Sequence, residues 1–290
     1  MIAVPVDYAT PSVLESNRER ATLGFAANAR RPVRFRGRLA RQIPLVRFAL
    51  RALGEAVWSS DTWESQDEHL ARILDPVVTV HPDRIFFEAF SQDQSVYASV
   101  ILDPALFEIE EPMQTGTTNI DFTAWLWAAL NELRSSRQTW LTVEAGGVEV
   151  ATQNSGGRFE RKVELPDGWV RGFLQITGAM AMPGTKLTAR PADLLAAIRF
   201  IRYTKARVSP RALRYEFIPG EDARLILEPW EQAIELRGAD HHYTEPRTIR
   251  TWGRRRLKLI GPLLPFADRV DIYLKGRSLP SFYALKMPGI

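Results

Sequence analysis

The side chains with the clearest chemical potential in this chain are its arginines. The 290 residues include 32 Arg and 6 Lys, and ten of the arginines fall between Arg18 and Arg51, with Glu19 as the only acidic residue among them. A guanidinium is a planar fork that binds a carboxylate or a phosphate through two parallel hydrogen bonds, which an ammonium cannot do. This local concentration of positive charge favours an acidic partner, either nucleic acid or an acidic protein surface.

Three basic clusters carry the predicted contacts, in residues 30–41, 199–214 and 247–258. The candidate binding residues within them are Arg30, Arg31, Arg34, Arg36, Arg38, Arg41, Arg202, Arg250, Arg254, Arg255, Arg256 and Lys258. Arg250 and Arg254 are four residues apart in a predicted helix and would share one face of it. A solvated surface on which the arginines pair with neighbouring Asp and Glu explains the clusters equally well, because charge alone supports only non-specific contacts.

No residues have the spacing of a catalytic or metal-binding motif. The chain has no Cys, which excludes thiol nucleophiles, disulfides, iron–sulfur clusters and zinc sites that need thiolates. The adjacent pair His241-His242 lacks the i, i+4 spacing of helical metal ligands. We therefore expect no catalytic residue, no metal and no cofactor, and predict that the chain is not an enzyme.

Composition predicts a folded protein whose basicity is local. The hydrophobic fraction of 45% and the charged fraction of 25% are ordinary for a globular domain, and the net charge is only +4. The lack of Cys fits a reducing compartment, and residues 1–10 lack the basic region of a signal peptide. No apolar run approaches the ~20 residues of a membrane span. We expect a cytoplasmic protein without a membrane partner.

The hydrophobic pattern predicts an α+β fold, in which antiparallel hairpins pack against helices. Apolar and basic residues alternate over Val33–Arg36, as in a half-exposed strand, and residues 43–58 have helical spacing. On that helix we expect a solvated face with Arg51 paired to Glu55. Further hairpins are predicted at residues 84–102, 140–152, 213–227 and 270–285, and further helices at 121–133, 167–180, 191–203 and 248–260.

Three parts are predicted along the chain. Residues 1–29 form a weakly ordered N-terminal segment, residues 30–115 an N-terminal α+β part, and residues 116–290 a second α+β part. In this second part, residues 116–183 and 184–290 each have the order helix, hairpin, strand, helix, which indicates an internal repeat. Residues 281–290 are apolar and strand-like, which indicates either a longer polypeptide or an edge completed by a partner subunit.

Several segments resemble the N-terminal region of a group of bacterial SWIM zinc-finger family proteins. They are Phe35–Ala40 (FRGRLA), Leu74–Arg84 (LDPVVTVHPDR), Phe86–Phe90 (FFEAF), Gly116–Phe122 (GTTNIDF), Leu165–Phe173 (LPDGWVRGF) and Trp252–Arg256 (WGRRR). In that family the finger has a Cys-x-Cys … Cys-x-His arrangement, so no zinc ligand can be assigned in this Cys-free chain. The resemblance implies an accessory or recognition module, whose finger lies farther along a longer polypeptide or in a separate subunit.

Three functional hypotheses follow. The first is a non-enzymatic recognition or accessory module of a larger bacterial assembly, which binds nucleic acid or an acidic protein surface through arginine-rich faces. The second is a protein–protein interaction scaffold, in which the arginines form intramolecular pairs and the apolar C-terminal hairpin binds a partner. The third is an enzyme of unrecognised class, which requires a concave pocket with convergent carboxylates or histidines. The first two differ in whether Arg34, Arg36 and Arg38 face solvent together or are divided between core-side and pairing roles.

Overall fold

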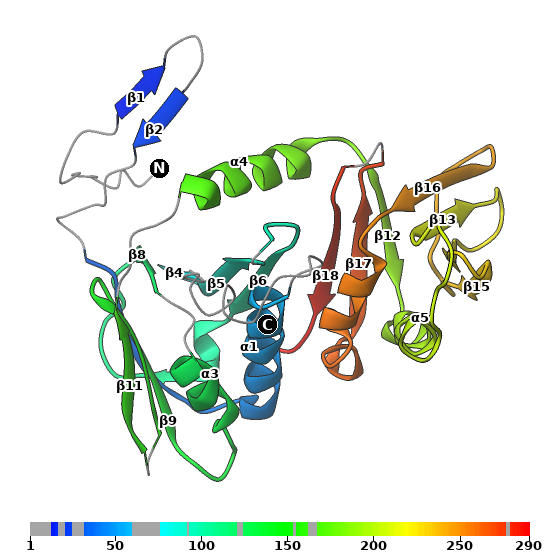
Figure 1. Ribbon diagram of the computed structural model, residues 1–290. Coiled ribbons are helices and arrows are strands. Elements are labelled where there is room, and N and C mark those ends of the chain that lie inside the picture. Colours follow the sequence, from blue (N-terminus) through cyan, green and yellow to red (C-terminus); the bar gives the residue numbers. More distant parts are fainter. Residues whose placement is uncertain are drawn as a thin grey trace.

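The computed structural model describes residues 13–16, 21–24, 32–59, 76–91, 93–120, 124–152, 155–161, 167–276 and 279–290. Within these ranges the predicted α+β class is confirmed, because antiparallel sheets are packed against a small number of helices (Figure 1). In the N-terminal segment, for which weak order was predicted, the strands β1 (Val13–Ser16) and β2 (Ala21–Gly24) form a hairpin.

The first unit of the fold has two sheets. Their strand orders are β11-β10-β9-β3-β7 and β6-β5-β4-β8. The elements are β3 (Arg34–Leu39), α1 (Ile43–Val57), β4 (Val77–His81), β5 (Arg84–Phe90), β6 (Tyr97–Leu102), the 3-10 helix η1 (Pro104–Leu106), β7 (Phe107–Ile109), β8 (Gly116–Asn119), α3 (Ala124–Asn131), β9 (Thr139–Glu144), β10 (Gly147–Thr152) and β11 (Ser155–Arg161). The segment after η1 joins the two sheets, since β7 pairs with β3 and β8 pairs with β4.

The second unit also has two sheets, with strand orders β12-β17-β18 and β15-β14-β13-β16. Its elements are β12 (Thr185–Ala189), α5 (Pro191–Tyr203), β13 (Leu213–Phe217), β14 (Arg224–Leu227), β15 (Gln232–Glu235), β16 (Arg247–Thr251), the 3-10 helices η2 (Arg254–Ile260) and η3 (Leu264–Phe266), β17 (Arg269–Leu274) and β18 (Ser281–Lys286). The helix α4 (Asp167–Ala181) runs between the two units along the upper side in Figure 1.

The two units repeat one topology. The strands β3, β9 and β10 correspond to β12, β17 and β18, the order β6-β5-β4-β8 corresponds to β15-β14-β13-β16, and α1 corresponds to α5. The repeating unit is therefore longer than the sequence pattern suggested, and its first copy begins at β3. The predicted division between residues 115 and 116 falls inside this copy, between β7 and β8. The 3-10 helix η2 occupies the place of α3 in the second copy, which obscures the repeat at the sequence level.

The helix predicted over residues 248–260 is wrong in its first half. Residues 247–251 form the strand β16, in which Ile249 and Thr251 are buried and Arg250 is exposed. The β-branched residues of this stretch fit a strand better than a helix. Gly253, with a φ of 75°, then turns the chain into η2. Arg250 and Arg254 consequently lie on different elements and do not share a helical face.

Each unit has its own hydrophobic core. In the first, α1 buries its apolar stripe, including Leu45, Ala49 and Leu53, against the sheets, and Phe35 of β3 is fully buried beside it. In the second, the two sheets enclose Tyr215 and Phe217 of β13 among aliphatic side chains. None of the helices in the described part of the chain is both long and apolar enough to cross a membrane.

Contacts between the units fix the second against the first. The rings of Phe48 on α1 and Phe266 on η3 stack with centroids 5.3 Å apart. The backbone N–H of Asp103 donates to the carbonyl of Gly289 at 2.9 Å, and Ile290 packs against the first core. The residues that follow β18 thus return to the first unit.

A hydrogen bond between two tyrosines joins the two sheets of the second unit. The hydroxyls of Tyr215 on β13 and Tyr283 on β18 are 2.7 Å apart, and burial raises the pKa of Tyr215 well above its usual value. We predict that Tyr283→Phe lowers the free energy of unfolding by about 1–3 kcal/mol, because the buried Tyr215 hydroxyl loses this partner. Urea denaturation measures the change. Tyr273→Phe on the neighbouring strand β17 is the control and should be nearly neutral; equal losses in both variants would contradict the prediction.

Candidate functional site

The arginines of β3 face solvent together and are paired within the chain. The pairs are Arg34 with Glu111 at 3.3 Å, Arg36 with Glu110 at 2.8 Å, and Arg38 with Glu108. We call this row of three pairs the β3–β7 charge ladder. Its side chains are partly to well exposed, so each pair adds little stability. The ladder neutralises three of the six arginine charges that make this cluster conspicuous in the sequence.

The other members of the first cluster divide into two groups. Arg30 and Arg31 lie outside the described residues. Arg41 follows β3, is exposed, and has no carboxylate partner in the part of the chain that the structure describes.

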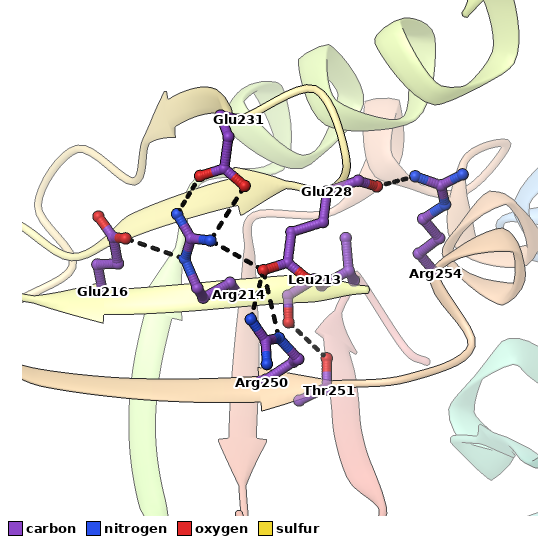
Figure 2. Close-up of polar contacts among 8 residues, drawn as sticks. All are labelled: Leu213, Arg214, Glu216, Glu228, Glu231, Arg250, Thr251 and Arg254. Atoms are coloured by element: carbon purple, nitrogen blue, oxygen red, sulfur yellow. Dashed lines mark hydrogen bonds and ion pairs between the residues drawn. The ribbon is translucent and has the colours of Figure 1, made fainter. Parts of the chain in front are cut away.

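A buried carboxylate links the second and third basic clusters, as Figure 2 shows. Glu228 is fully buried after β14, and its Oε1 accepts hydrogen bonds from Arg214 Nη1 and Arg250 Nη2, both at 2.8 Å. Arg214 also pairs with Glu216 and Glu231. The hydrogen bonds to Glu231, more than any other contact, raise the pKa of Arg214, and Arg214 in turn lowers the pKa of Glu231. We call these five side chains the Glu228 cluster.

Arg254 is an internal support and not a binding residue. Its side chain is buried, its Nη1 donates to the backbone carbonyl of Glu228, and its guanidinium lies 4.4 Å from the ring centroid of Trp230. Burial lowers the pKa of Arg254, and the positive charges of Arg211 and Arg255 lower it further. The predicted role of Arg254 in partner binding is therefore wrong, because the turn at Gly253 directs it inward.

Arg256 links the two units. Its Nη2 lies 2.6 Å from Asp93 Oδ2 in the β5–β6 connection, and both side chains are only 12% exposed. It also donates to Ser95 Oγ at 3.1 Å. The guanidinium of Arg256, which was predicted to contact a partner, is thus engaged in a largely buried ion pair within the chain.

Three of the remaining candidate cations, Arg202, Arg255 and Lys258, lie on a row of helical elements. Helix α1 contacts α3 on one side and η2 on the other, and η2 contacts α5. Figure 1 shows α3, α1, the orange helical segment and α5 following one another across the lower half of the molecule, on the side opposite α4. We call these four elements the helix row.

Four exposed cations lie on two neighbouring elements of the helix row. They are Arg199 and Arg202 on α5, and Arg255 and Lys258 on η2. Among the described residues, no carboxylate pairs with any of them. Arg199 was absent from the predicted set, although its spacing of three residues from Arg202 on one helix was the signal that should have included it.

The two arginines of α1 are half-buried and contact other parts of the chain. Arg47 Nη1 donates to the carbonyl of Leu133 at 3.3 Å, and the guanidinium of Arg51 lies 5.7 Å from the ring centroid of Trp127. The expected Arg51–Glu55 pair is not among the ion pairs of the described residues. A tryptophan from α3 thus takes the place of a carboxylate beside Arg51.

The described ranges contain no group of three or more His, Asp and Glu side chains that could hold a metal ion. The carboxylates that do gather, around Arg214, are satisfied by arginines. The exposed guanidinium groups of the helix row can each bind a phosphate or a carboxylate through two hydrogen bonds.

Comparison with known proteins identifies the architecture. No family model and no curated protein matches the chain. The fold is similar to that of proliferating cellular nuclear antigen (PCNA). PCNA from Entamoeba histolytica superposes with a TM-score of 0.53 at 13% identity, over 89% of this chain and 94% of the other. A chain of the PCNA2–PCNA3 complex from Sulfolobus tokodaii superposes with a TM-score of 0.59 at 12% identity, over 88% and 94%.

We predict that Glu228→Ala lowers the free energy of unfolding by about 3 kcal/mol, because Arg214 and Arg250 lose their shared buried partner. Glu231→Ala is the matched control, since its carboxylate also pairs with Arg214 but is 59% exposed; it should cost about 1 kcal/mol or less. Urea unfolding of the two variants and the unchanged chain gives both values. Similar losses in the two variants would show that burial of Glu228 is unimportant.

Proposed function

We propose that this chain is a non-enzymatic accessory module that binds nucleic acid through the helix row. The observation that carries the proposal is the set of four exposed cations on α5 and η2 that have no carboxylate partner among the described residues. Exposed, unpaired cations can exchange bound water and counterions for phosphates, and release of counterions drives such binding. Arg41 and the loop cations that follow α5, Lys205, Arg207 and Arg211, extend this charge.

The helix row is favoured over the other basic clusters because four of its cations are exposed and have no carboxylate partner among the described residues. The β3 arginines already pair with glutamates, so nucleic acid would have to displace those carboxylates first. Arg254 and Arg256 have internal roles, and Arg250 is bound to Glu228. Of the predicted contact residues that the structure describes, this leaves Arg41, Arg202, Arg255 and Lys258, and Arg199 joins them.

The similarity of fold to PCNA supports an accessory role in an assembly of proteins or of protein and nucleic acid. One of the similar structures is a complex of PCNA2 with PCNA3. We propose that this chain likewise works in an assembly with further chains. The edge strands β11 and β15 lie at opposite ends of the molecule in Figure 1 and offer unpaired backbone groups for such contacts. The relation to SWIM zinc-finger proteins, a bacterial origin and a cytoplasmic location stay predictions.

The second candidate is a protein-interaction scaffold. The observation that favours it is the β3–β7 charge ladder, in which three predicted contact arginines serve intramolecular pairs, as that hypothesis expects. A scaffold and a nucleic-acid-binding module are compatible if they use different surfaces.

Two variants with equal loss of charge test the nucleic-acid proposal. The first replaces three cations of the helix row, Arg199→Gln, Arg202→Gln and Arg255→Gln. The second replaces the three ladder arginines, Arg34→Gln, Arg36→Gln and Arg38→Gln. We expect the row variant to bind a mixed-sequence DNA duplex about tenfold or more weakly and with a shallower salt dependence, because each lost phosphate contact removes about one unit of slope. The ladder variant should bind like the unchanged chain.

Fluorescence anisotropy at two salt concentrations measures both affinities and slopes. No binding of DNA or RNA at low salt would overturn the proposal. An equal loss in the two variants would also overturn it, because overall charge and not the helix row would then decide binding.

A further inference from the structure

A groove of about 700 Å³ lies in the second unit, where edge strands of its two sheets come together. One wall is the end of the α4 segment with the start of β12, residues 182–185. A second part of the lining is β16 with the following Trp252. Tyr243, Leu274, Lys275, Gly276 and Leu279 complete the lining. The groove is distinct from the helix row, since none of the exposed row cations lines it.

The lining combines cations with apolar and aromatic side chains. Arg247, Arg250 and Lys275 supply positive charge, and none of the described residues that line the groove is acidic. Arg250 is bound to Glu228, and Lys275 Nζ donates to the carbonyls of Met180 and Met182, so Arg247 is the lining cation that a partner can reach. Arg247 is exposed, stacks on Tyr243 at 5.0 Å, and has no carboxylate partner among the described residues. Trp252 is 58% exposed. An exposed tryptophan beside unpaired charge is typical of protein-interaction surfaces.

The groove also presents backbone. Both β12 and β16 are edge strands, each paired on one side only, with β17 and β13 respectively. An edge strand leaves every second residue's N–H and C=O groups without a ladder partner, and an added peptide strand satisfies them. In the first unit the corresponding edge of β3 carries β7, whereas the described part of the second unit pairs no strand there.

The first unit shows what kind of strand suits a basic edge. Residues 107–111 have the sequence FEIEE, and three of their carboxylates pair with the arginines of β3 in the charge ladder. An acidic strand thus lies against a basic strand within this chain. In the second unit the basic edge strand is β16, which carries Arg247 and Arg250, and no acidic strand pairs with its outer edge among the described residues.

We propose that the groove binds an extended acidic segment of a partner protein, which adds as a strand to β16. A carboxylate of the segment pairs with Arg247, and an apolar side chain packs against Trp252 and Met182. A peptide main chain supplies both donors and acceptors to the edge strand, whereas a phosphate backbone supplies acceptors alone. The apolar part of the lining also favours a peptide, because a peptide can present apolar side chains to it.

A nine-residue peptide with the sequence of residues 106–114, LFEIEEPMQ, serves as the probe. We expect the fluorescently labelled peptide to bind the full chain in an anisotropy titration, and a version with Gln at the three Glu positions to bind much more weakly. Arg247→Gln and Trp252→Ala should each weaken binding about tenfold, because a charge-assisted hydrogen bond and a buried aromatic contact are lost. Arg199→Gln on the helix row is the control and should bind the peptide normally.

Hydrogen exchange supplies a second readout. Binding should slow exchange of the backbone amides of β16, which a purely ionic contact of side chains would not do. Failure of the peptide to bind at about 1 mM, the weak limit of specific recognition, would overturn the proposal. Binding that is unaffected by Arg247→Gln would do the same, since this exposed substitution leaves the fold intact. Displacement of the peptide by a DNA duplex would instead assign the groove to nucleic acid.

Discussion

One buried carboxylate holds together the part of the molecule on which both proposed surfaces depend. The side chain of Glu228 binds Arg214 of β13 and Arg250 of β16, and its backbone carbonyl accepts from Arg254 at the start of η2. The strand β16 forms one wall of the groove, and η2 carries Arg255 and Lys258 of the helix row. A carboxylate without water around it requires compensating charge, and two guanidinium groups provide it. The same interaction therefore positions a sheet edge and a helical element that have different proposed partners.

The arginines in the described part of the chain divide by environment into three groups. Some pair with carboxylates on an exposed sheet, as in the charge ladder. Others are enclosed and hold elements together, as Arg254 does beneath Trp230 and Arg256 does against Asp93. Only the third group, exposed and without a carboxylate, is free to attract an anion. A count of basic residues includes all three groups. It therefore overstates the positive charge that is available to a partner.

The two units differ where a binding surface is expected. They share the order of strands, but the first unit completes the edge of β3 with the acidic strand β7, whereas no described strand pairs with the corresponding edge of β12. An edge without a neighbouring strand leaves backbone N–H and C=O groups exposed to a partner. The same topology therefore forms one unit with an added edge strand on β3 and one unit without a described strand at the corresponding position.

The sequence by itself determined the local elements and the fold class. Alternation at Val33–Arg36 predicted β3, the apolar spacing after Pro44 predicted α1, and the paired strands around polar turns predicted the hairpins, because these depend on neighbouring residues alone. The sequence-based prediction failed at residues 248–251, because the alternation of β-branched residues and arginines there does not distinguish a helix from a strand. Tertiary structure alone decided which arginines are free. Arg36 meets a glutamate 74 residues away and Arg256 an aspartate 163 residues away. Pairing across such separations depends on how the sheets and units pack, and no local pattern of charge contains that information.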